Sequence, residues 1–445
     1  MRILKKKGRI SMAFSLKGVH VPHRKNTADM SPVKMEAPGS VIIPTSMHIG
    51  APAVPVVKKG DKVNVGTLIA EAGNGLSSPI YSGVSGTVSG IADLLMVDGK
   101  TVPAITIESD GEQTVCETVA PPTINDKAEL IKAIKDSGIV GLGGAGFPTY
   151  AKFTTDKKIE TLIINGAECE PYITSDSITM TENAEDIVFA IQTLIKYFQI
   201  DSAIIGIENN KPSAIASMKK AIGDNPQISL KVLPSLYPQG GEKVLIYHTT
   251  GRVVPQGKLP IDVGCVVINS TTTAFIGKYL KTGMPLVEKC VTVDGSAVKE
   301  PKNVIVPIGT PLKDVFEFAG GFKSEPKKVL YGGPMMGISV PDMSYPVIKN
   351  TNATIALNEA ETVIPKTTAC IRCGACINHC PFGINPPAIA KALKNEDFEA
   401  MEEAGAGLCM ECGCCSYVCP ASRPLVANNK LAKKALNEHK KKEGK

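Results

Sequence analysis

One cysteine spacing, which occurs twice near the C-terminus, constrains this chain more than any other feature. Each copy has three cysteines at intervals of three residues and a fourth cysteine four residues later, directly before a proline. The two sets are Cys370, Cys373, Cys376 and Cys380, and Cys409, Cys412, Cys415 and Cys419. Bacterial proteins with two iron–sulfur clusters hold [4Fe–4S] cubes by this spacing.

Three thiolates of one tight loop can hold three irons of a cube, so the fourth iron needs a sulfur from elsewhere in the chain. In two-cluster proteins of this type the other motif supplies it. We therefore expect one cluster on Cys370, Cys373, Cys376 and Cys419. The other cluster is expected on Cys409, Cys412, Cys415 and Cys380.

Zinc and disulfides are the alternative uses of these cysteines. Zinc takes four thiolates as two separated pairs, and a secreted disulfide scaffold is short and carries a signal peptide. The two cysteine motifs of this chain fit neither the zinc pattern nor the disulfide pattern. Cys414 lies outside the register and is predicted to be a thiol outside the ligand set. Four scattered cysteines in apolar stretches are expected to act as small buried hydrophobic residues, namely Cys116, Cys169, Cys265 and Cys290.

Length predicts a multidomain protein, and reduced cysteines in iron–sulfur motifs predict a reducing compartment. A chain of 445 residues exceeds one hydrophobic core, which favours about three or four domains. No run of eighteen apolar residues or signal-type start occurs, so we expect neither a membrane span nor export. Lysines gather at both ends, including Lys5, Lys6 and Lys7. Such ends could meet anionic lipid or an acidic partner, or simply be solvated termini. No nucleic-acid partner is predicted.

Patterning divides the chain into modules of α/β and α+β type. Short strands broken by glycine and proline predict an all-β module within residues 1–120. Strands and helices then alternate through 121–282, which indicates an α/β domain with a mainly parallel sheet. A small α+β module follows at 283–350, the cluster domain at 351–430, and a basic tail at 431–445. An amphipathic helix is expected within Asn125–Gly138.

A glycine loop, Gly141-Leu142-Gly143-Gly144-Ala145-Gly146, fits the pattern G-x-G-x-x-G. A dinucleotide-binding loop of that pattern follows a strand and opens a helix, whereas this loop follows a helix and meets Pro148. A standard dinucleotide site is therefore disfavoured. Glycines still expose backbone N–H groups that can cradle a phosphate, although a packing loop would also use them.

Four segments make the sequence similar to a known family. GLGGAGFPTYAKF, NGAECEP, YPQGGEKVL and NSTTT follow the order of four loops in the flavin-binding subunit of respiratory complex I, where they enclose FMN and NADH. The stretch KKGDKVNVGTLIAE with SPIYSGVSGTVSGI resembles the lipoyl-type barrel-sandwich fold, but its hairpin tip reads Gly73-Asn74-Gly75 without the carrier lysine. The module order, with a β-grasp module at 283–350, resembles that of the C subunits of Rnf-type electron transport complexes.

This resemblance implies the residues of a flavin and nucleotide site. Gly143, Gly144 and Gly146 would bind the flavin phosphate beside Lys152, and Phe147 would stack on the adenine of NADH. Asn165, Glu168 and Glu170 would be the Asn and acidic positions around the isoalloxazine and the nicotinamide ribose. The family's Tyr-x-x-Gly-Glu-Glu loop would be represented by Tyr237, Gly240, Gly241 and Glu242, and its Asn-Val-Glu-Thr loop by Asn269 and Thr272. The chain departs from complex I at three positions, with Leu142 in place of arginine, Cys169 in place of glycine and Gly241 in place of glutamate.

The function that the resemblance implies is electron transfer between NAD(H), FMN and two [4Fe–4S] clusters, with no catalytic acid or base. Partner subunits of a membrane-embedded complex would translocate Na⁺ or H⁺, and one iron–sulfur partner would receive electrons from ferredoxin. The chain would lie on the cytoplasmic side of the cell membrane as a peripheral subunit. Two alternatives are a diaphorase subunit of a soluble hydrogenase or bifurcating enzyme, and a flavin-free iron–sulfur carrier or scaffold.

Overall fold

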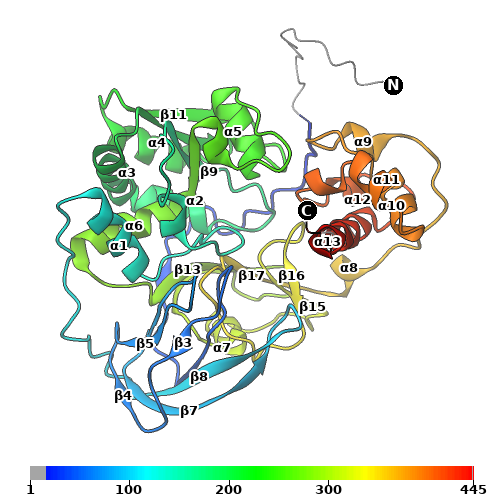
Figure 1. Ribbon diagram of the computed structural model, residues 1–445. Coiled ribbons are helices and arrows are strands. Elements are labelled where there is room, and N and C mark those ends of the chain that lie inside the picture. The colour runs from blue at the N-terminus through cyan, green and yellow to red at the C-terminus, as the bar shows by residue number, and fades with distance from the viewer. Residues whose placement is uncertain (1–16, 443, 445) are drawn as a thin grey trace. The chain divides into compact units, whose positions relative to one another are not determined.

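The structure is a computed structural model that describes residues 17–442 and 444. The predicted N-terminal lysine cluster, Lys5 to Lys7, lies outside the described residues. Chain contacts divide the protein into two compact units. One unit is Val21–Pro365, and the other comprises 366–445 with the described residues up to His20. Figure 1 shows the elements of both units. Between residues 17 and 442, no helix has the length and apolar character that crossing a membrane requires.

The first module of the larger unit consists of two small antiparallel sheets. The four-stranded sheet has the order β2-β8-β7-β4 and the three-stranded sheet the order β3-β5-β6. Alternate residues such as Val41, Ile43, Ile105 and Ile107 are fully buried between them, which accounts for the strand pattern. The strands are β2 (Ser40–Pro44), β3 (Val54–Pro55), β4 (Lys62–Val63), β5 (Leu68–Glu71), β6 (Ile80–Tyr81), β7 (Gly86–Leu95) and β8 (Thr101–Ser109). The predicted all-β module is confirmed.

The second module is an α/β domain on a parallel sheet of order β11-β10-β9-β12. Its strands are β9 (Thr161–Gly166), β10 (Ser202–Glu208), β11 (Ile228–Leu233) and β12 (Cys265–Asn269). Its helices are α1 (Lys127–Asp136), α2 (Ser175–Glu182), α3 (Ala184–Phe198), α4 (Pro212–Ile222), α5 (Glu242–Thr250) and α6 (Ser270–Thr282), with 3₁₀ turns at Thr149–Lys152 and Pro260–Val263. The Asp126 side chain caps α1, as the predicted helix requires.

Both faces of this sheet are covered, so its strands are apolar on both sides. Leu162 and Ile164 pack with residues of α3, α4 and α6. Ile163 points to the other face and packs with Leu245 of α5. Figure 1 shows α5 on the opposite side of the sheet from α3 and α4. The chain runs from β9 outward to β11 and then returns to place β12 on the other side of β9.

The third module is a six-stranded mixed sheet of order β1-β14-β13-β17-β15-β16 with one helix. Its elements are β1 (Val33–Lys34), β13 (Glu288–Asp294), β14 (Lys302–Pro307), α7 (Leu312–Phe318), β15 (Lys328–Tyr331), β16 (Ile338–Val340) and β17 (Ala353–Leu357), followed by α8 (Glu359–Thr362). This sheet extends beyond the predicted range 283–350 at both ends. The buried strand β17 forms its centre, and β1 joins its edge from the N-terminal part of the chain.

The smaller unit holds both cysteine motifs among short helices. These are α9 (Ala375–Asn378), α10 (Pro386–Lys394), α11 (Phe398–Glu403), a 3₁₀ turn (Ala406–Leu408), α12 (Cys414–Tyr417) and α13 (Leu425–Lys442). The helices α10 and α11 lie between the two motifs. Residues 431–442 of the predicted basic tail lie in α13. Its Ala432 and Leu436 lie four residues apart on the buried face, which packs on α10.

Two helix ends offer a matched pair of substitutions. Gly251 ends α5 at φ 75° and Gly283 ends α6 at φ 74°, so alanine would be strained alike at both. A Cβ at Gly251 would meet nothing within 4 Å, whereas one at Gly283 would lie 2.0 Å from the Ala120 carbonyl oxygen. We expect Gly251→Ala to lower the free energy of unfolding by about 1 kcal/mol, and Gly283→Ala by about 2 kcal/mol more. Urea denaturation measures both, and equal losses would contradict the close contact.

Candidate functional site

The carboxyl edge of the parallel sheet brings together several of the predicted site residues. Ligands of open α/β sheets bind at this edge, where the strand order reverses. Here the reversal lies between β9 and β12, and Asn165 pairs in register with Asn269 at that point. The Asn165 amide donates to the Gly240 carbonyl at 2.9 Å. The Asn269 oxygen accepts from the Thr272 N–H at 3.1 Å and so caps α6.

The glycine loop lies against this edge. The Leu142 N–H donates to the Thr272 hydroxyl at 3.0 Å, and a Cβ at Gly143 would come within 2.4 Å of the Asn269 amide nitrogen. Gly143 and Gly144 are exposed. The loop is preceded by α1 and followed by a 3₁₀ turn, so it is not the strand-to-helix turn of a standard dinucleotide site. At Gly143 the loop presents its backbone at a place where a side chain would not fit.

Two other modules hold the same loop. The Ile49 N–H of the barrel-sandwich module donates to the Gly146 carbonyl at 3.1 Å. From the β-grasp module, the Asn350 amide donates to the Gly144 carbonyl at 3.0 Å. Gly146 has φ 69°, and its missing Cβ leaves room for the backbone of Met47 and His48. The loop is therefore shaped by parts of the chain that are about 300 residues apart.

Glu168 is buried and serves the helix that follows it. Its carboxylate accepts from the N–H groups of Asp176 at 2.8 Å and Ser177 at 3.4 Å, in the first turn of α2. Burial raises the pKa of Glu168 to about 7, and the nearby Lys25 opposes this rise. The partners of this carboxylate in the structure are helix amides, and its place among the groups around the flavin stays a prediction.

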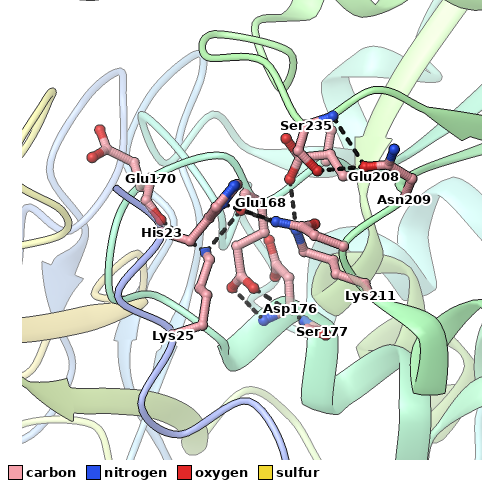
Figure 2. A network of polar contacts seen from close by, with 12 residues as sticks. His23, Lys25, Glu168, Glu170, Asp176, Ser177, Glu208, Asn209, Lys211 and Ser235 are labelled. Carbon is pink, nitrogen blue, oxygen red and sulfur yellow. Dashed lines mark hydrogen bonds and ion pairs between the residues drawn. The ribbon is translucent and has the colours of Figure 1, made fainter. Parts of the chain in front are cut away.

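Two lysines hold the backbone of the loop that carries Glu168, as Figure 2 shows. The Lys25 ammonium donates to the carbonyl oxygens of Glu168 at 2.9 Å and Glu170 at 2.8 Å, and also to that of Ile173. The Lys211 ammonium donates to the Glu168 carbonyl at 3.2 Å and pairs with Glu208 at 2.5 Å. Sequence analysis missed both lysines. Lys25 stands in a short basic run, and nothing local marks it as the partner of a loop 140 residues away.

Glu170 connects the α/β domain to the β-grasp module. Its carboxylate accepts from the N–H groups of Met335 at 3.0 Å and Met336 at 2.8 Å. Gly333 allows this approach, because a Cβ there would lie 2.3 Å from the carboxylate. Burial raises the pKa of Glu170 to about 7 even though the two amides lower it. This carboxylate, too, has backbone partners, and its position around the flavin stays a prediction.

The loop after β11 completes the edge. Tyr237 is buried, and Gly240 packs so closely that a Cβ would lie 2.3 Å from the Ala167 carbonyl oxygen. Gly241 precedes α5, whose first residue Glu242 pairs with Lys152 at 3.3 Å. Lys152 also donates to the Val267 carbonyl at 2.7 Å.

Two further residues of this region are Phe147, a predicted site residue, and Cys169. Phe147 is partly buried, and its carbonyl closes the glycine loop by accepting from the Gly141 N–H at 2.9 Å. Cys169 stands where complex I has glycine, and burial raises the pKa of its thiol to about 12. A thiol of that pKa stays protonated near neutral pH.

The eight motif cysteines line two cavities in the smaller unit. A cavity of about 200 Å³ is lined by Cys370, Cys373, Cys376 and Cys419. A smaller cavity is lined by Cys380, Cys409, Cys412 and Cys415, together with Cys414. Each cavity thus receives three cysteines of one motif and the fourth of the other. Four soft sulfur donors around one space suit an iron–sulfur cube. The structure groups the cysteines as the crossed pattern predicts, and the ligand roles themselves stay a prediction.

The two cavities differ in their surroundings. Cys370 and Cys373 are exposed, whereas Cys380, Cys409, Cys412 and Cys415 are buried. The Cys409 sulfur also accepts from the Glu411 N–H at 3.4 Å and from the Asn429 amide at 3.5 Å. Hydrogen bonds to sulfur and solvent exposure both tune cluster potentials, so clusters in the two cavities would have different potentials.

The pKa of Glu170 gives the contact between modules a pH dependence. Because this pKa is raised from 4.5 to about 7, the folded chain binds the proton more tightly than the unfolded chain. The contribution to stability is therefore full below pH 4.5 and is lost as the pH rises through 7. The side chain of a Glu170→Gln variant does not titrate. Between pH 4.5 and 7 we therefore expect the free energy of unfolding of this variant to fall by on the order of 2 kcal/mol less than that of the wild-type chain. Urea denaturation at stepped pH measures the slope, and an unchanged slope in the variant would contradict the assignment.

Family models match the chain in four places that follow its modules. They are the RnfC barrel sandwich hybrid domain at residues 14–112, the Nuo51 FMN-binding domain at 134–278, the SLBB domain at 290–339, and the 4Fe-4S dicluster domain at 362–420. The glycine loop, the strand ends and the cysteine motifs described above fall within these matches.

Curated relatives match along most of the chain. It is 42% identical over 395 residues to the C subunit of the proton-translocating ferredoxin:NAD⁺ oxidoreductase complex of Clostridium ljungdahlii, covering 87% of this chain and 86% of the relative. It is 40% identical over 425 residues to the C subunit of the Na⁺-translocating ferredoxin:NAD⁺ oxidoreductase complex of Acetobacterium woodii, covering 94% and 96%.

Among solved structures, the chain resembles an NAD⁺-reducing [NiFe]-hydrogenase in the air-oxidised state. The TM-score is 0.50 at 18% identity, over 70% of this chain and 63% of the other. That likeness shows a shared fold and carries no functional argument. The family models and the curated relatives confirm the family predicted from the loops and cysteine motifs. The chain therefore belongs to the family of C subunits of ion-translocating ferredoxin:NAD⁺ oxidoreductase complexes, the Rnf family.

Proposed function

We propose that this chain is the NAD(H)-facing electron-transfer subunit of a membrane-bound Rnf-type complex. It carries electrons between NAD(H), FMN and two [4Fe–4S] clusters, while partner subunits translocate the ion and one iron–sulfur partner exchanges electrons with ferredoxin. The observation that carries the proposal is one chain with both an exposed glycine loop at a switch point and eight cysteines in two groups of four. We place it on the cytoplasmic side, because its motif cysteines need a reducing compartment.

The glycine loop is the proposed site of the FMN phosphate. Gly143 and Gly144 are exposed, and the tight packing of Gly143 on Asn269 supports a loop shaped to present backbone N–H groups. Lys152 supplies positive charge next to this edge of the sheet, where Glu242 is its present partner. Phe147 is the proposed stacking partner of the adenine of NADH.

The polar residues of the neighbouring loops are proposed to shape the site. Asn165 and Asn269 fix the ends of two adjacent strands, and Tyr237, Gly240 and Gly241 lie in the loop that packs on them. Glu168 and Glu170 hold the loop after β9 through backbone amides. We therefore assign these two carboxylates to positioning that loop.

FMN, when bound, exchanges a hydride with nicotinamide and releases electrons singly, and [4Fe–4S] clusters carry single electrons onward. The chain contributes binding, orientation and exclusion of water around these groups. Glu168 and Glu170 each have a pKa of about 7, but their carboxylates bond backbone amides, so the proposal gives neither one a proton to transfer. The thiolates of the two cysteine groups are the proposed iron ligands.

The family assignment bears on the two alternatives. A relative that aligns with 94% of this chain is named a subunit of a ferredoxin:NAD⁺ oxidoreductase complex, which supports the Rnf proposal over a soluble diaphorase. A flavin-free carrier would have no need for a glycine loop that three modules hold in place.

The proposal is tested by anaerobic reconstitution of the full chain with iron, sulfide and FMN, followed by NADH. Flavin absorbance and electron paramagnetic resonance are recorded together. We expect flavin bleaching and then the signals of reduced clusters. Assembly of both clusters without FMN binding, with NADH leaving them oxidised, would favour the carrier alternative and remove the assignment of the glycine loop.

The crossed ligand pattern predicts which cluster each cysteine serves. Cys380 belongs to the first motif by sequence but lines the cavity of the second. We therefore expect Cys380→Ser to damage the cluster held mainly by Cys409, Cys412 and Cys415, and to leave the other cluster in place. Iron content and the two cluster signals are the measurements.

Cys414 provides the matched control, because it lines the same cavity but stands outside the spacing. Cys414→Ser is expected to retain both clusters. Loss of only the cluster on Cys370, Cys373 and Cys376 in the Cys380 variant would overturn the crossed assignment, and loss of a cluster in the Cys414 variant would add that thiol to the ligand set.

A further inference from the structure

The β-grasp module supplies hydrogen-bond donors to two carbonyl groups of the glycine loop. Lys289 on β13 is 5% exposed, and its ammonium donates to the Leu142 carbonyl at 3.4 Å. The same ammonium also donates to the Lys349 carbonyl at 2.9 Å, which anchors it within its own module. The Asn350 amide donates to the Gly144 carbonyl at 3.0 Å. The module thus holds the loop at two positions that are two residues apart.

The barrel-sandwich module holds the next carbonyl in the same alternation. Its Ile49 N–H donates to the Gly146 carbonyl at 3.1 Å. The carbonyls of residues 142, 144 and 146 therefore all bond donors from outside the α/β domain. Leu142 is 2% exposed, so its carbonyl has little access to water that could replace the lysine.

The planar trans peptide unit fixes where the N–H groups opposite these carbonyls point. In each unit, the carbonyl of one residue and the N–H of the next point in opposite directions. The bonded carbonyls therefore turn the N–H groups of Gly143, Ala145 and Phe147 away from the two other modules. Within the described part of the chain, none of these three N–H groups donates a hydrogen bond. Gly143 and Ala145 are also exposed, so their N–H groups lie at the surface of the loop.

We propose that Lys289 and Asn350 are positioning residues that orient the glycine loop so that the N–H groups of Gly143 and Ala145 face a bound phosphate. This deepens the proposed function, since it rests on that loop holding the FMN phosphate. Backbone N–H groups that are free of protein partners attract an anion. The β-grasp module thereby sets the affinity for the flavin phosphate through the backbone of another module. Ala145 joins the proposed site, although the resemblance to complex I pointed only to glycines of this loop.

The test compares FMN with riboflavin, which lacks the phosphate, on the full-length chain. Binding of each flavin is measured by the quenching of its fluorescence. Lys289→Met is expected to weaken FMN binding about tenfold and Asn350→Ala about fivefold, because each leaves one loop carbonyl without its donor. Riboflavin binding should change less than about twofold in both variants.

Tyr81→Phe is the matched control. The Tyr81 hydroxyl of the barrel-sandwich module donates to the Asp136 carbonyl at the end of α1, so it joins two modules next to the glycine loop without bonding the loop. This variant should leave the ratio of FMN affinity to riboflavin affinity unchanged. An equal fall of that ratio in Tyr81→Phe would overturn the inference, because any loosening between modules would then produce the effect.

Two other outcomes would also overturn the inference. Equal weakening of FMN and riboflavin in Lys289→Met and Asn350→Ala would leave both residues as contacts that only stabilise the fold. A changed ratio in Lys289→Met without one in Asn350→Ala would assign the effect to the charge of the lysine. If Lys289→Met does not fold, Asn350→Ala decides alone, since Asn350 is partly exposed and uncharged. A wild-type chain that binds neither flavin would instead refute the proposed function, and this inference with it.

Discussion

The loop that follows β9 owes its shape to backbone carbonyls held by two lysine ammonium groups, and much of the candidate site depends on that loop. Lys25 and Lys211 donate to carbonyl oxygens of Glu168, Glu170 and Ile173. Buried carbonyls without partners would cost free energy, and so would the buried Lys211 and the partly buried Lys25. The hydrogen bonds between them give both the carbonyl oxygens and the ammonium groups a partner. With its backbone fixed, the loop can direct the Glu168 carboxylate to α2 and the Glu170 carboxylate to the β-grasp module.

The barrel-sandwich module, which lacks a carrier lysine, also contacts a loop that is distant in the sequence. Barrel-sandwich domains of the carrier type present a lysine at a hairpin tip, and here Asn74 and Gly75 are exposed at that position. The structure shows a different use of the module, because Ile49 bonds the glycine loop and Met47 lies against Gly146. The β-grasp module adds Asn350 to the same loop. Three modules that look separable in sequence therefore meet at one loop.

In the smaller unit, two similar motifs produce two dissimilar cavities. Each motif places its third cysteine in a short helix preceded by a glycine of positive φ, Gly374 at 76° and Gly413 at 81°. The repeated local geometry follows from the repeated sequence. The difference in exposure does not, because it arises from packing of the second motif against α13, where Asn429 reaches the Cys409 sulfur. Similar loops can thus hold clusters in different electrostatic surroundings.

Local patterns in the sequence determined the modules, the helix capped by Asp126, the grouping of eight cysteines and, through resemblance, the family. These features depend on spacing and on neighbours close in the chain. Only the tertiary structure decided that β1 and β17 belong to the β-grasp sheet and that Glu168 and Glu170 bond backbone amides. It also brought Lys25 and Lys289 to loops more than 140 residues away. A single lysine carries no local signal of its partner, because that partner is set by how whole modules pack.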